Sequence, residues 1–268
     1  MGKKYVIVTG ATGGLGKAFC EILARNGKNL ILSATKQVKI EEFRLELLKI
    51  NSSIDIVCKQ CDMSNWESRK DFFDFIRQSN YQIEMLVNNA GYITEGAIGS
   101  ATAESLIQAV RVNCEGTVDL TKFVVDCHKT SEKLNILTVS SFAAFQPMPY
   151  MAIYAATKSF LLSFMTALRE EVKNEGIVVS TALPSGIYTT QAMKEAIASQ
   201  GIGGKLASHS PEYIASYALK KAEQGKAIII PGAFNRFTKF ASNFVSYTKL
   251  AKIAGKRWRK SQVKRNLL

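Results

Sequence analysis

The sequence has few of the side chains that hold metal ions. Its 268 residues include only two histidines, His128 and His209, and five scattered cysteines, of which Cys58 and Cys61 form a single CxxC pair. A zinc site needs a second such pair, or histidines at a matching spacing. We therefore predict no metal site. We interpret Cys58 and Cys61 as packing residues at a strand end, with a redox pair or half of a zinc site as the alternative.

The sequence also lacks a long apolar run. No stretch approaches the ~18 apolar residues that cross a bilayer. The N-terminal segment MGKKYVIVTG enters a strand-like pattern at once and leaves no room for a signal peptide. An odd number of cysteines in such a chain indicates free thiols. We expect a cytoplasmic protein.

Acidic residues are absent from the C-terminal segment. Residues 234–268 contain ten Lys or Arg and no Asp or Glu, so the rest of the chain carries only +3 of the net charge of +13. Apolar residues recur there at spacings of three and four, which predicts an amphipathic helix. Two interpretations stay open: the helix packs on its own domain or on a partner subunit, or it contacts anionic lipid at a membrane surface. No recognition motif for nucleic acid is present, and we predict no such partner. The apolar positions are Phe237, Phe240, Phe244, Tyr247, Ala251, Ala254 and Trp258.

Strand-like and helix-like segments alternate through most of the chain. This pattern predicts an α/β fold, a doubly wound Rossmann fold with a seven-stranded parallel sheet covered on both faces. One domain over residues 1–232 would be followed by a basic, amphipathic helical extension over 233–268. The predicted strands are 5–9, 29–33, 54–58, 83–91, 134–141, 177–186 and 226–230. The predicted helices begin after the first strand and reach about residue 27, then cover 37–50, 64–79, 101–129 as one long helix and 152–174, and start again at Ser210-Pro211.

A glycine-rich segment, TGATGGLG at 9–16, follows the first predicted strand. Glycine lets the backbone turn sharply and approach a ligand, and the following helix N-terminus attracts phosphate. The alternative is a tight strand-to-helix turn, but the position favours a dinucleotide. The glycines fit both GxxxGxG and GxxGxxG spacings, so the subtype stays open. The predicted cofactor residues here are Gly10, Thr12, Gly13, Gly14, Leu15 and Gly16.

The tip of the second predicted strand carries no acid. An acid there would bind the ribose of NAD and repel the phosphate of NADP. The sequence reads Ser33-Ala34-Thr35-Lys36. Thr35 and Lys36 would hold the 2′-phosphate, which favours NADP(H) over NAD(H), whereas the plain alternative makes Lys36 a solvated turn residue.

Tyr154 and Lys158 lie four residues apart on a predicted helix and therefore share a face. A free tyrosine has a pKa of about 10. A lysine ammonium and an oxidised nicotinamide nearby would lower that pKa and let the phenol exchange a proton with a ketone or an alcohol. The pair alone would be a coincidence. Ser140-Ser141 ends the fifth strand, NNAG (88–91) ends the fourth, and Asn113 lies within a predicted helix, where asparagine has a poor propensity.

Together these segments resemble the short-chain dehydrogenase/reductase family. The family pattern TGxxxGxG, NNAG, Asn, Ser, YxxxK and PGxVxT occurs in order over residues 5 to about 232. The resemblance implies that Tyr154 is the catalytic acid/base and that Lys158 lowers its pKa and holds the nicotinamide ribose. It further implies that Ser141 positions the substrate oxygen and that Asn113 supports a water-linked proton relay.

The resemblance also implies further cofactor contacts. An acid after the third strand would contact adenine, a turn after the fourth strand would lie against the cofactor, and a loop after the sixth strand would lie beside the nicotinamide. That loop reads PSGIYT and departs from the family at Ser185, where glycine is usual. The implied residues are Asp62, Met63, Asn89, Ala90, Gly91, Pro184, Gly186, Ile187 and Thr189.

Aromatic and apolar residues flank the expected reaction centre. No charged residue occurs in 134–157, which favours an apolar ketone or secondary alcohol over a sugar phosphate. The glycines of the segment 187–206 are consistent with a mobile lid. The resemblance adds that some relatives act on steroids or fatty acyl chains and that members are commonly dimers or tetramers, so we expect a homo-oligomer. The candidate pocket residues are Phe142, Phe145, Met148, Tyr188 and Met193.

These observations predict an NADP-dependent oxidoreductase that transfers a hydride between the nicotinamide and an apolar carbonyl compound. The rival is a dinucleotide-sensing protein that has the same fold but no turnover. The complete set of Asn113, Ser141, Tyr154 and Lys158 argues against the rival.

Overall fold

As predicted, the sheet of the described residues has seven parallel strands, and their order is β3-β2-β1-β4-β5-β6-β7. The computed structural model describes residues 3–79, 81–129 and 132–264, with the side chains at 192 and 260–264 left out of the description. The strand order reverses between β1 and β4, and ligands of such sheets bind at the carboxyl ends beside that reversal. The strands are β1 (Lys4–Thr9), β2 (Asn29–Ser33), β3 (Ile56–Cys58), β4 (Gln82–Asn88), β5 (Leu134–Val139), β6 (Ile177–Ala182) and β7 (Ile228–Ile229).

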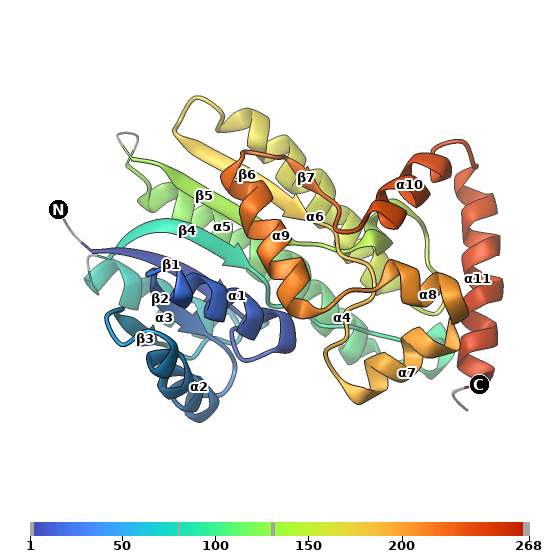
Figure 1. The fold of residues 1–268 in the computed structure, drawn as a ribbon, viewed down its shortest axis with the longest axis horizontal. Coiled ribbons are helices and arrows are strands. Elements are labelled where there is room, and N and C mark those ends of the chain that lie inside the picture. The colour runs from blue at the N-terminus through green and yellow to red at the C-terminus, as the bar shows by residue number, and fades with distance from the viewer. Residues whose placement is uncertain (1–2, 80, 130–131, 265–268) are drawn as a thin grey trace.

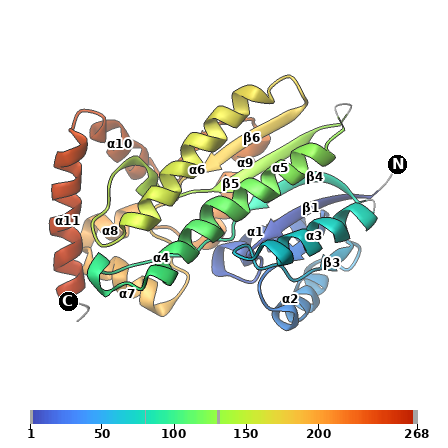
Figure 2. The ribbon, with the colours of Figure 1, turned by 180° about the vertical axis from the view of Figure 1, so that it is seen from behind.

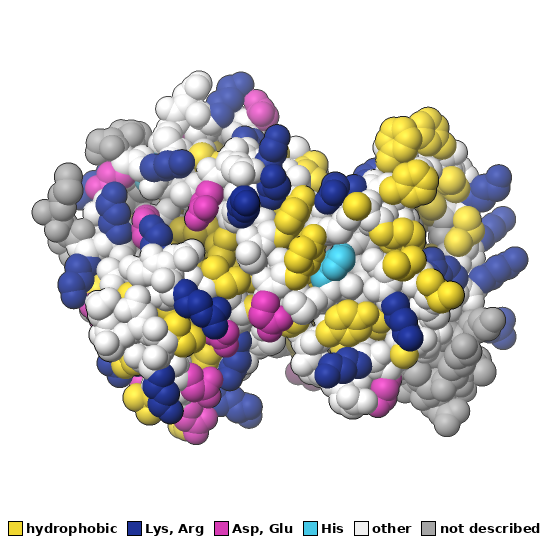
Figure 3. All heavy atoms as spheres, viewed as in Figure 1, with side chains coloured by type: hydrophobic (Ala, Val, Ile, Leu, Met, Phe, Trp, Pro, Cys, Tyr) yellow, Lys and Arg dark blue, Asp and Glu magenta, His cyan; other side chains and the backbone are white. Residues whose placement is uncertain are grey.

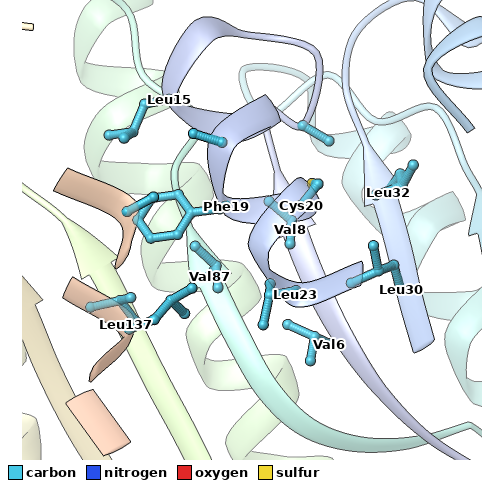
Figure 4. Close-up of a cluster of buried hydrophobic side chains, with 14 of the residues drawn as sticks. Val6, Val8, Leu15, Phe19, Cys20, Leu23, Leu30, Leu32, Val87 and Leu137 are labelled. Carbon is cyan, nitrogen blue, oxygen red and sulfur yellow. The ribbon is translucent and has the colours of Figure 1, made fainter. Parts of the chain in front are cut away.

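Helices cover both faces of the sheet (Figures 1 and 2). Alternation along β1 turns Val6 and Val8 toward one face and Tyr5 and Ile7 toward the other. On the first face Phe19 and its helix pack over the strands (Figure 4). The first face carries α1 (Gly14–Arg25), α2 (Gln37–Ile50) and α9 (Pro211–Glu223), and the second carries α3 (Trp66–Ser79), α5 (Gly116–Cys127) and α6 (Ala152–Glu171).

The long helix predicted over 101–129 is present as a continuous helical run from residue 103 to residue 127, but it contains a π-helical segment that was not predicted. The structure has α4 (Ala103–Val110), a π-helix over Arg111–Glu115 and then α5. The wide turn contains Asn113, whose buried side chain leaves the helix face to bond the backbone of Tyr92. Gly116 follows at once, because a Cβ there would lie 2.4 Å from the Met63 carbonyl oxygen. Interruptions of this kind occur frequently at functional sites.

The segment predicted as a lid folds into two short helices, α7 (Gln191–Ser199) and α8 (Gly201–Ala207). Gly201 joins them with a φ of +71°, a conformation that suits glycine. Ser210 caps α9 by accepting a hydrogen bond from the Tyr213 amide, and Pro211 is its first residue, as predicted. Movement of the segment stays a prediction.

The tail forms two helices, so the prediction of one amphipathic helix is wrong. They are α10 (Ala233–Ser242) and α11 (Tyr247–Lys264). The chain tightens between them, where the amides of residues 243–245 bond carbonyls three residues earlier, and the Ser246 carbonyl then starts α11. The predicted tail residues 265–268 lie outside the described part of the chain. Across the described residues no helix is long and apolar enough to span a bilayer.

The two tail helices use their apolar positions differently. Ala254 of α11 is buried, and a Cβ on Gly255 would lie 3.2 Å from Pro149. From α10 across the turn to the start of α11, the aromatic side chains instead face outward. Figure 3 shows hydrophobic side chains gathered over this region, with Lys and Arg side chains along α11 beside them. The exposed fractions are 68% for Phe237, 61% for Phe240, 78% for Phe244 and 61% for Tyr247.

Candidate active site

The predicted site residues gather at the carboxyl ends of β1, β4, β5 and β6, which are neighbours in the sheet. The glycine-rich loop follows β1, and Asn89–Gly91 follow β4. Ser141 follows β5, and Pro184 follows β6. Parallel strands therefore bring segments from four parts of the sequence to one edge.

The glycine-rich loop has the shape of a phosphate cradle. Gly10 has a φ of +61°, and a Cβ there would lie 3.0 Å from the Ala90 Cα atom. A Cβ on Gly16 would lie 2.1 Å from the Gly10 oxygen, so Gly16 lets α1 pack against the turn. A Cβ on Gly14 would meet Thr189 at 2.7 Å, which places the loops after β1 and β6 side by side.

The first turn of α1 fits a dinucleotide phosphate. Gly13 is its N-cap and provides no side-chain hydrogen bond. The first amides of a helix have no partner within the helix, and with the helix dipole they form an anion site. Thr12 is half-buried beside them, whereas the side chain of Leu15 is buried in the core, so only its backbone can serve a cofactor.

Asn89 holds the loop in place. Its Nδ2 atom donates to the Thr9 and Gly10 carbonyl oxygens at 3.0 and 3.2 Å. The Thr9 hydroxyl in turn accepts from the amides of Asn89 and Ala90, both at 3.0 Å. Sequence reasoning missed Thr9. Its position at the end of a buried strand, directly before the glycine-rich segment, was the available signal.

The residues expected at the adenosine end lie at two neighbouring strand tips. Thr35 and Lys36 are exposed, and Lys36 precedes α2. The Asp62 Oδ1 atom accepts hydrogen bonds from the Ser64 amide at 2.9 Å and the Ser64 hydroxyl at 2.7 Å. This turn fixes the carboxylate at the edge of the sheet.

A buried arginine, which sequence reasoning missed, supports the adenosine end. Arg69 is 1% exposed and donates to the Met63 carbonyl oxygen at 2.7 Å. It also pairs with Glu115 of the π-helix and with Asp119 at 2.8 Å. The signal was its place among the apolar positions 69, 72, 73 and 76 of α3, where a cation is buried only with partners.

Lys158 is buried at the predicted reaction centre. It is 4% exposed, and its ammonium donates to the Val139 carbonyl at 2.9 Å. Burial lowers the pKa of Lys158 from 10.5 to about 8. A Cβ on Gly91 would lie 3.6 Å both from the Lys158 Nζ atom and from the Asn113 Oδ1 atom, so these three predicted residues meet.

Tyr154 faces Ser141. Burial raises the pKa of Tyr154, and a side-chain hydrogen bond with Ser141 acts in the opposite direction. The lowering of the Tyr154 pKa by Lys158 and a bound nicotinamide stays a prediction. The Lys158 ammonium is directed at the Val139 carbonyl and lies 5.8 Å from the centre of the Tyr154 ring.

The two neighbouring serines at the end of β5 have different surroundings. The Ser140 hydroxyl is buried and donates to the Lys158 carbonyl at 2.8 Å. Ser141 is half-buried and accepts from the Ala143 amide at 3.1 Å. Asn113 donates to the Thr157 hydroxyl at 3.0 Å, and Thr157 donates to the Tyr154 carbonyl at 2.8 Å. Thus Asn113 is tied to the helix that carries Tyr154.

The loop after β6 is held against the start of α9. The Pro184 carbonyl accepts from the Phe142 amide at 2.8 Å. A Cβ on Gly186 would lie 2.0 Å from the Ser208 hydroxyl, and Ile187 pairs with His209 as an isolated parallel bridge. Ser185 does not prevent this path. Ser208 and His209 were missed because the pairing joins residues about twenty apart.

The five candidate pocket residues surround the same end of the domain. Phe142 and Phe145 meet edge to face at 5.5 Å, and Lys239 of α10 lies 4.7 Å from the Phe145 ring centre. Met148, Tyr188 and Met193 are half-buried. None of these five is among the described residues that line the cavity of about 1180 Å³ next to the site.

The CxxC thiols do not have the properties of a redox pair. Burial raises the pKa of Cys58 to about 12 and that of Cys61 to about 11. A reactive cysteine has a lowered pKa. Within the described chain, no group of three or more His, Cys, Asp or Glu is placed to hold a metal ion.

The comparison with protein families agrees with this geometry, since the short chain dehydrogenase family matches residues 4–212. The chain belongs to the short-chain dehydrogenase family. Similar proteins include a very-long-chain 3-oxoacyl-CoA reductase of Pyricularia oryzae, 32% identical over 68% of this chain and 56% of that protein. Another is 17-beta-hydroxysteroid dehydrogenase type 3 of Mus musculus, 31% identical over 69% of this chain and 61% of that protein. The chain thus spans little more than half the length of these relatives.

A solved structure shares the arrangement. It is a short-chain dehydrogenase from Sphingobium yanoikuyae in complex with NADPH, 26% identical, with a TM-score of 0.76 over 90% of this chain and 93% of that one. The Rossmann fold of this chain is therefore the fold of its family.

Proposed function

We propose that this family member is an oxidoreductase that transfers a hydride between NADP(H) and an apolar ketone or secondary alcohol. The observation that carries the proposal is the side-chain hydrogen bond between Tyr154 and Ser141, with the buried Lys158 ammonium 5.8 Å from the centre of the Tyr154 ring. A phenol and a hydroxyl that face the same point can bind one carbonyl oxygen together.

A bound nicotinamide supplies the hydride in reduction and accepts it in oxidation. In reduction Tyr154 donates its phenolic proton to the ketone oxygen, while Ser141 holds that oxygen in place. In oxidation Tyr154 removes the proton from the alcohol. Because burial raises the pKa of Tyr154, the phenol is protonated at neutral pH, which is the form that reduction needs.

The supporting residues position these groups. Lys158 would bind the nicotinamide ribose, and its positive charge favours the phenolate that reduction leaves behind. Asn113 would connect to a proton relay, since its side chain lies beside Lys158 near Gly91. The loop residues Pro184, Gly186, Ile187 and Thr189 would enclose the nicotinamide. The adenine would be contacted by Asp62 and Met63. The turn after β4, with Ala90 and Gly91, would lie against the cofactor.

The preference for NADP(H) is supported by the charge at the tip of β2. Lys36 is exposed there, Thr35 adds a hydroxyl, and no acid is present to repel a phosphate. The NADPH complex of the relative from Sphingobium yanoikuyae is consistent with this choice.

The substrate class is supported by the apolar residues around the site and by the names of the relatives. Those names describe the reduction of 3-oxoacyl-CoA and the dehydrogenation of a hydroxysteroid, both reactions at a carbonyl or hydroxyl group on an apolar body. A panel of acyl-type and steroid ketones and alcohols, followed by the absorbance of NADPH or NADH, tests the proposal. Cofactor binding without turnover of any member would favour the rival, a dinucleotide-sensing protein.

The proposal also covers the oligomeric state of the enzyme, its location in the cell and its contact with membranes. We expect a cytoplasmic homo-oligomer, and the exposed Phe160, which stacks on Phe164 along α6, supports contact between subunits. Residues 1–232 would form the catalytic domain and 233–268 an extension that touches an anionic membrane. The outward aromatic side chains of α10 support that contact.

A further inference from the structure

A cavity of about 1180 Å³ lies between the catalytic domain and the tail helix. Its walls come from residues 93–106 after β4, from residues 149–153 before and within the start of α6, and from residues 251–259 of α11. In Figures 1 and 2 α11 stands across one end of the domain, beside α7. The tail therefore completes a cavity that the catalytic domain alone would leave open.

The lining of the cavity is divided by polarity. Ile93, Leu106 and Ile153 provide apolar surface on the side of the domain. Lys252, Lys256 and Arg259 provide three cations on the side of α11, and their spacing of four and three places them on one helix face. Such a combination is complementary to an apolar chain that ends in an anion.

The three cations are available to a ligand. All are exposed, and none takes part in the salt bridges of the described chain. Glu95 is the acidic residue among the described lining residues, so the wall has a positive balance. Because the three cations lie on one wall of the cavity, they can attract the same anionic ligand.

Two chain segments that line the cavity continue into the predicted reaction centre. Ile153 directly precedes Tyr154, and Ile93 directly follows Tyr92, whose backbone is bonded by Asn113. The Tyr150 carbonyl accepts from the Gly96 amide at 2.8 Å, which ties the two walls together. Tyr150 has a φ of +68°, a left-handed conformation that is strained for a tyrosine. Strain of this kind concentrates at functional sites.

We propose that this cavity binds the anionic end of the substrate, with the apolar chain against Ile93, Leu106 and Ile153 and a carboxylate or phosphate against Lys252, Lys256 and Arg259. The inference rests on the proposed function and narrows it to ketones that carry an anion on an apolar chain. A free keto acid and a phosphate-bearing acyl carrier share this chemistry, and the test separates them.

The binding test uses octanoate, octyl phosphate and neutral 1-octanol below their aggregation concentrations, measured by calorimetry on the full chain. We expect both anions, or one of them, to bind about tenfold more tightly than octanol. Lys256→Glu should remove that advantage and leave octanol binding unchanged. Lys249→Glu is the matched control, because Lys249 belongs to the same helix but does not line the cavity. Preference for octyl phosphate would indicate a phosphate-bearing carrier, and preference for octanoate a keto acid.

The proposal is overturned if octanol binds as tightly as both anions, or if Lys249→Glu weakens anion binding as much as Lys256→Glu does. A turnover arm compares a keto acid with its neutral methyl ester. Lys256→Glu should raise KM for the acid about tenfold, with kcat and the ester unchanged. If no ketone is turned over but the binding preference holds, the proposed function fails while the cavity assignment stands.

Discussion

Lys158 lies one helical turn from Tyr154, yet its ammonium donates to the Val139 carbonyl at 2.9 Å and lies 5.8 Å from the centre of the Tyr154 ring. The lysine therefore has no direct bond to the phenol. It lies as a buried cation at the end of β5, where Gly91 leaves space beside it. The phenol instead bonds Ser141. The proton donor, Tyr154, is thus separate from the positive charge of Lys158. Substitutions of the two residues should therefore have different effects on turnover and on cofactor affinity.

Tyr154→Phe removes the proton and keeps the ring. We expect turnover to fall about 10²–10⁴-fold, the range that a positioned acid/base supplies, with cofactor affinity nearly unchanged. Lys158→Ala should reduce both turnover and cofactor affinity, because Lys158 also binds the ribose in the proposal. Steady-state rates and fluorescence titration with NADPH measure the two effects. A Phe variant that kept more than about a tenth of the rate would disprove the assignment of Tyr154.

Lys158→Met tests the cost of the buried cation. In the folded state the pKa of Lys158 is lowered from 10.5 to about 8, so the Lys158 amine binds a proton less readily there than in the unfolded chain. At every pH where the unfolded chain carries this proton, the lysine therefore destabilises the folded state. Below pH 8 the full cost is present, about 3 kcal/mol by the size of the shift. Between pH 8 and 10.5 the cost disappears as the lysine becomes neutral in the unfolded chain too.

The measurement for this prediction is urea unfolding of the wild type and Lys158→Met at several pH values. The free energy of unfolding of the variant minus that of the wild type should be largest at pH 7 and should decrease toward pH 10.5. Other titrating groups cancel in the difference. A difference that stays constant with pH would show that the ordinary pKa of Lys158 is retained in the folded state.

Asn113→Ala should destabilise the folded chain. Asn113 is fully buried, accepts from the Tyr92 amide at 2.8 Å and donates to the Tyr92 carbonyl at 2.9 Å. Removing the amide leaves two backbone groups without partners, which costs about 3 kcal/mol in total. Urea unfolding measures the loss, and Asn113→Asp, which retains only the acceptor, should lie between the wild type and Ala. Equal stability of all three proteins would contradict the structural role.

The strands and the order of the motifs could be predicted because local chemistry determines them. The strands β1, β2 and β5 are buried on both faces of the sheet. Because both faces are buried, their sequences are continuous apolar runs that can be recognised without the structure. The glycine-rich loop follows from its position after the first strand, whereas the roles of Ser141, Tyr154 and Lys158 follow from the resemblance to the family pattern. Asn113 was found too, although the π-helix around it was not, because its bonds to Tyr92 join distant segments.

Features that depend on tertiary contacts were beyond sequence reasoning. The partners of Arg69 come from α5 and the π-helix, and no local pattern encodes them. The same holds for the tail, whose periodicity is continuous across the break at residues 243–246. The apolar spacing there could not indicate that Ala254 is buried while Phe244 is exposed.

Lys36→Asp tests the choice of cofactor. Lys36 is exposed at the tip of β2, so the substitution should leave the fold unchanged. The new carboxylate would repel a 2′-phosphate and accept a hydrogen bond from a free ribose hydroxyl. We expect the wild type to bind NADPH more tightly than NADH and the variant to reverse this order. Lys39→Asp, on the exposed side of α2, is the control for net charge. Equal dissociation constants of the two cofactors in the wild type would remove the argument.

The last prediction concerns the membrane contact of α10. Its aromatic side chains are exposed next to a tail with ten cations and no acid, and each cation near an anionic surface contributes about 1 kcal/mol. We expect the wild type to co-sediment with anionic vesicles at low salt and to dissociate from them at high salt, with no binding to neutral vesicles.

Point variants test this contact better than truncation does. Because α11 buries Ala254 and closes the cavity, deletion of the tail would destabilise the domain as well as remove the surface. The double variant Phe240→Ser/Phe244→Ser should abolish vesicle binding and preserve turnover of a small ketone. Val38→Ser, which changes an apolar side chain that is 71% exposed on α2, is the control. If the wild type does not sediment with anionic vesicles at low salt, or if the double variant sediments equally well, the aromatic end of α10 has another role, such as contact with a second subunit.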